Sequence, residues 1–186
     1  MLIVLFILRP IVRLVCRILY RIRFQGVENI PASGACIIAP NHVTFVDPIW
    51  ITIPMPRPIY YMAWDKPFEI PVLGWLMRKF GAFPLNLDRI DPAAQREARD
   101  RLNGGGALVI FPEGGRSKAG RVERFKSGAF RLALAHGVPI VPVTLKGAYE
   151  VWPRGQLLPK LWGRITITYH PSIEVARLPE GIAKSE

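Results

Sequence analysis

Short apolar runs separated by turns and helical stretches follow one another along the chain after Gly26. Runs of four or five residues, most of them next to a glycine or proline, are typical of buried strands. Strands that alternate with helices predict an α/β fold with a mostly parallel or mixed sheet flanked by helices. The predicted strands are residues 35–39, 59–62, 107–111, 140–144 and 165–169.

Two helices have clear ends. Asp91-Pro92 places a capping residue before a proline at the first helical position, and Gly104–Gly106 stops that helix after about Asn103. The second predicted helix begins near Ser127 and ends at His136-Gly137. Since 186 residues are too few for two ordinary domains, we expect one domain over residues 25–178 and a C-terminal tail at 179–186.

The N-terminal segment, residues 1–24, predicts an amphipathic helix. Its apolar run ends at Arg9, far short of the ~20 residues that cross a bilayer, and its charge follows the run, unlike a cleaved signal peptide. Arg9, Arg13, Arg17 and Arg21 recur every four residues and form one basic stripe. We expect this helix to lie on anionic lipid at the membrane surface. The alternative is an ordinary packing helix with a solvated charged face.

The net charge of +11 implies an anionic partner, which is membrane phospholipid, nucleic acid or an acidic carrier protein. The sequence contains no recognised nucleic-acid-binding motif, so we expect no nucleic-acid partner. Cys16 and Cys36 have neither CxxC spacing nor an adjacent histidine, and we expect no metal and no disulfide.

A candidate catalytic pair follows the first predicted strand after Gly26. His42 comes three residues after Ala39, and Asp47 follows five residues later, before Pro48. A turn between them brings the carboxylate onto the imidazole, which fixes the tautomer and raises its basicity. The free ring nitrogen then accepts a proton from a substrate hydroxyl. The alternative is a structural histidine beside a helix-capping aspartate.

A second polar loop follows the strand at 107–111. Phe111–Ser117 reads Phe-Pro-Glu-Gly-Gly-Arg-Ser and combines a carboxylate, two glycines, an arginine and a hydroxyl, which suits contacts to a phosphate. The carboxyl ends of parallel strands share one edge of the sheet, so Glu113 and His42 could meet there. Residues 114–131 are strongly basic, and Arg89 ends another short apolar run. The alternative for this loop is a polar glycine-rich turn.

These motifs, in this order, resemble the glycerolipid acyltransferase family that includes 1-acylglycerol-3-phosphate acyltransferases, over roughly residues 26–169. The resemblance implies that His42 is the catalytic base, oriented by Asp47. It implies acceptor binding by Glu113 and Gly114, with Gly115 where many members have threonine. A last block, Val138-Pro139 with Pro142, shapes the acyl-binding side in the family or has a structural role. The phosphate-binding arginine falls where this chain has Leu87, so Arg89 is its expected substitute.

We therefore expect an acyltransferase in which His42 and Asp47 are catalytic. The expected substrate-binding residues are Asn41, Arg89, Glu113, Gly114, Arg116 and Ser117. The acyl donor is acyl carrier protein or coenzyme A, with no other cofactor, and the acceptor is a lysophospholipid, most simply 1-acylglycerol 3-phosphate. The protein is expected on the cytoplasmic face of the membrane.

Two alternatives stay open. One is an acyltransferase that uses glycerol 3-phosphate or another lysophospholipid, and another is a membrane protein that binds lysophospholipid without catalysis. A serine hydrolase is disfavoured because no Gly-x-Ser-x-Gly elbow occurs.

Overall fold

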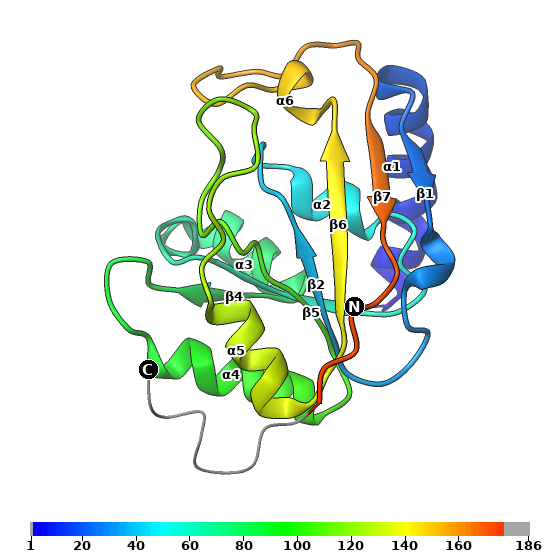
Figure 1. Cartoon of the computed structure of the whole chain (residues 1–186). Coiled ribbons are helices and arrows are strands. Elements are labelled where there is room, and N and C mark those ends of the chain that lie inside the picture. The colour runs from blue at the N-terminus through cyan, green and yellow to red at the C-terminus, as the bar shows by residue number, and fades with distance from the viewer. Residues whose placement is uncertain (1, 177–186) are drawn as a thin grey trace.

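A computed structural model of the chain describes residues 2–176, with side chains from residue 10 onward. Its seven-stranded sheet has the order β1-β7-β6-β2-β5-β3-β4, and β6–β7 is the antiparallel pair (Figure 1). The predicted mixed sheet is therefore confirmed. The strands are β1 Arg23–Gln25, β2 Cys36–Pro40, β3 Ile59–Trp64, β4 Ala82–Leu85, β5 Ala107–Val109, β6 Ile140–Lys146 and β7 Thr166–Tyr169.

Helices cover both faces of the sheet. They are α1 Leu2–Tyr20, α2 Asp47–Thr52, α3 Pro71–Lys79, α4 Pro92–Asn103, α5 Gly128–His136 and α6 Ala148–Val151, with 3-10 turns η1 Val27–Asn29 and η2 Lys66–Glu69. Helices α4 and α5 lie on one face, and α1 and α2 lie on the other (Figure 1). Because both faces are covered, central strands are apolar on both sides.

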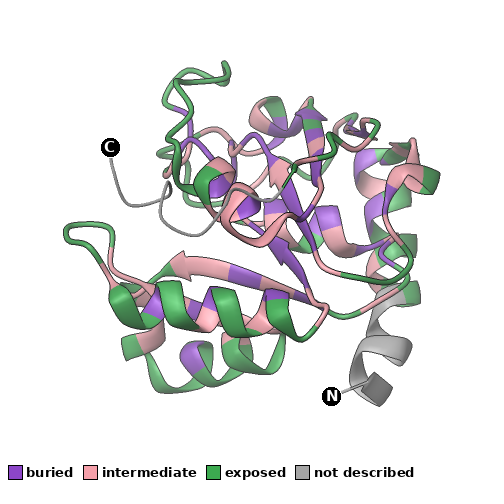
Figure 2. Ribbon diagram, turned by 60° about the horizontal axis from the view of Figure 1, so that its bottom comes forward, coloured by how far each residue is buried: buried purple, intermediate pink, exposed green. Residues whose placement is uncertain are grey.

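The side chains of β2 show how the two halves of the core divide. Ile37 packs in the half that α4 and α5 cover, whereas Cys36 and Ile38 pack in the half that contains α1 and α2. Figure 2 shows buried positions along the strands and exposed positions on the outer faces of the helices. Burial on both sides explains why the sequence of β2 is a continuous apolar run rather than an alternating one.

All five predicted strands are confirmed, and β1 and β4 are additional. Both lie at edges of the sheet. Strand β1 has three residues, two of them polar, and β4 contains Pro84, which is tolerated in an edge strand because a missing N–H there breaks no central ladder. Strand β1 has no apolar run, and the short apolar run of β4 is interrupted by Pro84, which argues against a buried strand.

The two predicted helices are also confirmed, with the expected caps. The Asp91 carboxylate accepts the N–H groups of Ala93 and Ala94 at 3.1 and 3.0 Å and caps α4. Gly137 ends α5 in the left-handed conformation, with φ 61°.

The segment predicted as residues 1–24 shares its core with the rest of the chain. Cys16 and Tyr20 of α1 are buried in the larger core cluster, and Arg23 of β1 already pairs with β7. No helix in the described part of the chain is long and apolar enough to cross a membrane. The predicted tail, residues 179–186, lies outside the described residues.

Parallel strands β2, β3, β4, β5 and β6 end at one edge of the sheet, here called the carboxyl edge. The segments that leave this edge include residues 41–46, 86–91 and 110–127. These are the segments in which the sequence places its polar motifs, so the topology gathers them on one side of the molecule.

Candidate active site

His42 and Asp47 form the predicted pair at the carboxyl edge, directly after β2. The Nδ1 atom of His42 lies 2.9 Å from Oδ2 of Asp47. The Asp47 side chain is fully buried, whereas 18% of the His42 side chain is exposed. A buried carboxylate thus holds one ring nitrogen while the imidazole still reaches the surface.

The Asp47 carboxylate also binds the turn that precedes it. Its Oδ2 atom accepts the N–H groups of Val43 and Thr44 at 2.6 and 2.8 Å, and its Oδ1 atom accepts the Thr44 hydroxyl at 2.5 Å. Asp47 is the first residue of α2, but no side chain caps that helix. The carboxylate therefore shapes the turn at residues 43–46 and orients the histidine, which argues against the helix-cap alternative.

The imidazole of His42 is further positioned by a ring that sequence reasoning did not single out. Phe111 stacks on it with ring centroids 4.0 Å apart and an interplanar angle of 26°. Within the described part of the chain, Nε2 of His42 makes no hydrogen bond. One ring nitrogen is thus engaged, and the other is available to a substrate hydroxyl.

Glu113 connects the loop at 111–117 to the histidine turn. Its Oε1 atom accepts the backbone N–H of His42 at 3.0 Å, and its Oε2 atom accepts that of Glu123 at 3.2 Å. The Ser117 N–H donates to the His42 carbonyl at 2.7 Å. The sequence prediction that residues 42 and 113 meet is confirmed, and the contact is made through the backbone of His42.

Burial raises the pKa of Glu113, although the two N–H donors act in the opposite direction. The folded protein therefore keeps a proton on Glu113 at a pH where the unfolded chain, with a glutamate pKa of about 4.3, has begun to lose it. The resulting contribution to stability is complete below about pH 4.3 and is lost as the pH rises through the raised pKa.

The variant Glu113→Gln tests whether the pKa of Glu113 is raised in the folded protein. We expect the free energy of unfolding of the wild type, relative to the variant, to fall as the pH rises from about 4.3, the unfolded value, and then to level off. Urea unfolding at a series of pH values measures the difference. A difference that rises with pH over this interval would mean that the N–H donors outweigh burial.

Asn41 and Ser117 are both used inside the protein. The Asn41 side chain donates to the Leu145 carbonyl at 3.2 Å and accepts the Leu145 N–H at 2.7 Å, which ties the end of β2 to β6. The Ser117 hydroxyl, which is buried, donates to the Arg121 carbonyl at 2.7 Å. Their contacts hold the loops of the site, and substrate binding by either side chain stays a prediction.

Gly114 allows the loop to turn beneath a lysine. Its φ is 70°, and a Cβ there would lie 2.7 Å from Nζ of Lys126. The Gly114 N–H donates to the Phe111 carbonyl at 3.0 Å. A side chain at this position would strain the backbone and displace Lys126, so glycine is required by the conformation.

Arg116 is the cation nearest the pair among the predicted arginines. Its guanidinium lies over the Phe45 ring, 3.3 Å from the centroid. Burial lowers the pKa of Arg116 and the charge of Arg154 lowers it further, while Asp47 raises it. Arginine nonetheless stays charged at neutral pH. Arg116 therefore places a positive charge beside the histidine turn.

Arg89 lies elsewhere along the carboxyl edge. It is exposed, in the turn after β4, and its N–H donates to the Asn86 side chain at 3.1 Å. Strands β5 and β3 separate β4 from β2, which places the two strand ends roughly 14 Å apart at about 4.8 Å per strand. Arg89 and Arg116 thus flank the edge at different distances from His42.

The last motif block, Val138-Pro139 with Pro142, lies mostly at the edge of the sheet opposite the carboxyl edge. Val138 and Pro139 precede β6, whose first residue, Ile140, pairs with Ile37 near the start of β2. Val138 is buried in the core half that α4 and α5 cover. These contacts give the start of this block a packing role.

A cavity of about 930 Å³ opens on the other side of the Phe111 loop, between α4, α5 and the end of β4. Its walls include Met62, Leu85, Phe111 and Leu132, and Lys126 lies among its lining residues. The cavity is thus largely apolar and shares the Phe111 ring with the His42 site.

No group of three or more metal-ligating side chains occurs among the residues that the structure describes. The amide N–H groups of residues 42, 43, 44 and 117 are all engaged within the protein. The site combines a histidine oriented by Asp47 and Phe111, a nearby arginine and an adjacent cavity that is largely apolar. Such an arrangement suits proton removal from a hydroxyl on an amphiphilic, anionic substrate.

Comparison with known proteins gives a consistent result. A model of the Acyltransferase family matches residues 21–146. A 1-acyl-sn-glycerol-3-phosphate acyltransferase of Brassica napus, BAT2, is 38% identical over 141 residues, which cover 73% of this chain and 40% of that protein. The enzyme of that name from Borreliella burgdorferi is 30% identical over 162 residues, covering 86% of this chain and 64% of that protein.

The chain therefore spans less than two thirds of the length of these relatives. Among solved structures, that of the 1-acyl-sn-glycerophosphate acyltransferase PlsC from Thermotoga maritima matches with a TM-score of 0.71 and 29% identity. The match covers 82% of this chain and 61% of that one.

Proposed function

Since this chain belongs to the acyltransferase family, whose model it matches over residues 21–146, we propose that it transfers a fatty acyl group from an acyl thioester to the free hydroxyl of 1-acylglycerol 3-phosphate. The product is phosphatidate. The observation that carries the mechanism is His42, with Nδ1 bound to a buried carboxylate and Nε2 without a partner in the described structure. The relatives named as 1-acyl-sn-glycerol-3-phosphate acyltransferases support the choice of acceptor.

The proposed reaction is a direct transfer. Nε2 of His42 takes the proton of the acceptor hydroxyl while its oxygen attacks the thioester carbonyl. The tetrahedral intermediate collapses, the carbon–sulfur bond breaks, and the thiolate leaves with the proton that His42 had taken. Asp47 stabilises the positive imidazolium that exists between these steps. No metal and no nucleophile from the protein takes part.

Arg116 is the proposed principal ligand of the acceptor phosphate. It lies beside the histidine turn, and its guanidinium can donate two parallel hydrogen bonds to phosphate oxygens. The phosphate and the free hydroxyl of the acceptor belong to one glycerol unit, so the phosphate ligand must lie near His42. Arg89, roughly three strands away, is proposed as a second contact that its long side chain makes by extending inward. Glu113 and Gly114 shape the loop between these groups.

The apolar cavity of about 930 Å³ is proposed to hold an acyl chain. It begins at the Phe111 ring, which stacks on His42, so a chain lying there keeps its carboxyl end close to the catalytic nitrogen. Removal of the chain from water supplies about 0.8 kcal/mol for each buried methylene group.

The donor is proposed to be acyl carrier protein or coenzyme A, which are both anionic. Residues 121–126 expose Arg121, Arg124 and Lys126 against the single carboxylate of Glu123, and such a surface attracts an anionic partner. We place the reaction at the cytoplasmic face of the membrane, where a lysophospholipid is available. No other cofactor is required.

Measuring thiol release against a panel of acceptors tests this function. With labelled acyl thioester, we expect release to require lysophosphatidate and to equal the phosphatidate formed. Glycerol 3-phosphate and lysophospholipids with other head groups are the competing acceptors, and preference for one of them would reassign the substrate. Binding of lysophosphatidate without any thiol release would identify a non-catalytic binding protein.

A further inference from the structure

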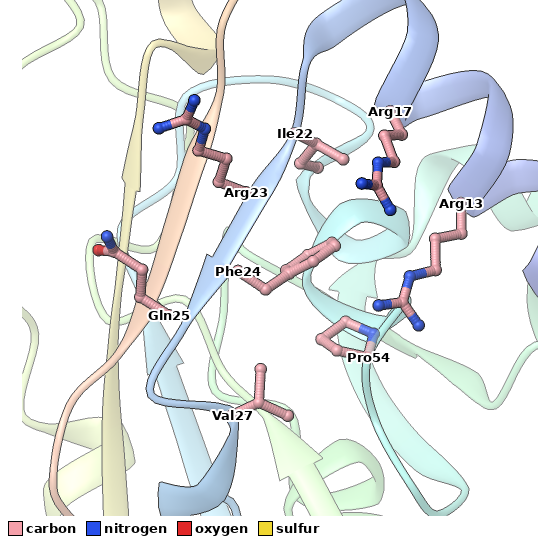
Figure 3. Close-up of a pocket in the computed structure, with 8 residues that line it drawn as sticks. All are labelled: Arg13, Arg17, Ile22, Arg23, Phe24, Gln25, Val27 and Pro54. Carbon is pink, nitrogen blue, oxygen red and sulfur yellow. The ribbon is translucent and has the colours of Figure 1, made fainter.

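A second cavity, of about 570 Å³, lies between α1, β1 and the segment after α2. Figure 3 shows Arg13 and Arg17 entering it from α1, with Ile22, Phe24, Val27 and Pro54 around them. Ile22 is buried and the other three apolar residues are half-buried. The cavity therefore combines two cations with an apolar wall, and the proposed reaction makes no use of it.

The cavity faces only part of the local positive charge. Arg23 and Gln25 also line the cavity. Side chains alternate along a strand, however, and Figure 3 shows the Arg23 and Gln25 side chains extending to the opposite side of β1 from the Phe24 ring. Gln25 is engaged there, because its Oε1 atom accepts the Thr168 hydroxyl at 3.1 Å. Arg13 and Arg17 are thus the two guanidinium groups that point toward the cavity.

Neither Arg13 nor Arg17 forms an ion pair with any residue in the described part of the chain. They are four residues apart on one helix, and like charges at that spacing repel each other. An anion bound between them removes this repulsion. Guanidinium groups match phosphate oxygens in geometry as well as charge, so the chemistry favours a phosphate.

The outer surface of α1 indicates what carries that phosphate. Cys16 and Tyr20 face the core, and Arg13 and Arg17 come next around the helix. Beyond them is an apolar face whose residues Ile11, Leu14, Val15 and Ile18 are 54, 58, 45 and 57% exposed. The arginines therefore lie at the boundary between protein and an uncovered apolar face, where the head group of a lipid meets its chains.

A second apolar patch adjoins the end of α1. The Gly163 N–H donates to the Leu19 carbonyl at 3.1 Å and fixes the loop at 152–165 against the helix. This loop exposes apolar side chains and contains three cations and no carboxylate, a composition suited to an anionic lipid surface. The exposed apolar residues are Leu157, Leu158, Leu161 and Trp162.

We propose that the cavity between α1 and β1 binds the phosphate-bearing head group of an anionic membrane phospholipid, while the apolar face of α1 lies among the acyl chains. Strands β7 and β6 separate β1 from β2, so this site is roughly 14 Å from the strand that leads to His42. The lipid held here is a fixed ligand of the protein and is distinct from the acceptor. This inference does not depend on the proposed function.

The test measures co-sedimentation of the full chain with phosphatidylcholine vesicles that contain phosphatidylglycerol. It compares Arg13→Gln/Arg17→Gln with Arg21→Gln/Arg164→Gln, a control that removes the same charge from exposed residues of the same region that do not line the cavity. Loss of one exposed surface arginine lowers the affinity for such vesicles about fivefold. Loss of one arginine that is hydrogen-bonded to a phosphate lowers it about tenfold or more. We expect the first double variant to bind at least about fourfold more weakly than the second. Equal losses would overturn the site.

Two further measurements identify the ligand source. Leu14→Ser/Ile18→Ser should weaken vesicle binding and leave the affinity for inorganic phosphate unchanged. Inorganic phosphate that binds as tightly as the vesicles would make this a site for free phosphate and overturn the lipid assignment. His42→Ala should bind vesicles like the wild type, and Arg13→Gln/Arg17→Gln should keep wild-type transfer to a detergent-dispersed acceptor. These results separate this site from the proposed reaction.

Discussion

Asp47→Asn is expected to lower kcat for acyl transfer by about 10²- to 10⁴-fold, the contribution of a well-placed general base. Asparagine has the shape of aspartate, and its side-chain oxygen can still accept the N–H groups of Val43 and Thr44. It has no charge, however, and so cannot stabilise the imidazolium that the proposed mechanism forms at His42. The variant thus removes the electrostatic support of the base and keeps the turn.

The pattern of kinetic constants separates this role from a structural one. Since Asp47 is buried and touches His42 rather than a substrate, KM for both substrates should stay near its wild-type value while kcat falls. Asp100→Asn, an exposed change on α4, provides the matched control and should leave kcat unchanged. An Asp47→Asn protein that is folded and transfers at the wild-type rate would remove Asp47 from the mechanism.

The His42–Asp47 pair could be predicted because its geometry is local. Asp47 lies five positions after His42, and the intervening turn brings them together. Sequence reasoning also predicted the meeting of Glu113 with the histidine turn, because buried parallel strands end at one edge. Both predictions depend on local turns and on strand direction, which apolar runs and prolines indicate.

The parts that could not be predicted depend on tertiary placement. The position of Arg89 relative to His42 is set by the strand order, which puts β4 at the sheet edge, and no local pattern encodes that order. Asn41 and Ser117 are polar residues in the right motifs, yet their side chains bond backbone groups of Leu145 and Arg121. A polar side chain next to a site is equally suited to a substrate or to an unpaired backbone group.

Apolar members of the site were overlooked for a different reason. Phe111 stacks on His42 and Phe45 lies under Arg116, but aromatic residues in such motifs resemble ordinary core residues in sequence. In α1, the periodicity indicated a basic stripe against an apolar remainder. The structure divides that remainder into a buried face and an exposed one, with the stripe between them.

His42→Ala should preserve the fold, which makes it an informative test of the base. After loss of the imidazole, the Asp47 carboxylate still accepts two N–H groups and the Thr44 hydroxyl, so no buried charge is left without a partner. The partial exposure of His42 limits the packing that is lost. His136, at the end of α5 that leads to the start of β6, supplies a control histidine away from the carboxyl edge.

The most direct measurement is therefore kcat for phosphatidate formation from acyl thioester and lysophosphatidate, in the wild type, His42→Ala and His136→Ala. With Nε2 of His42 as the base, kcat should fall by about 10²- to 10⁴-fold in His42→Ala and stay at the wild-type value in His136→Ala. Equal rates in the wild type and a folded His42→Ala would contradict the mechanism.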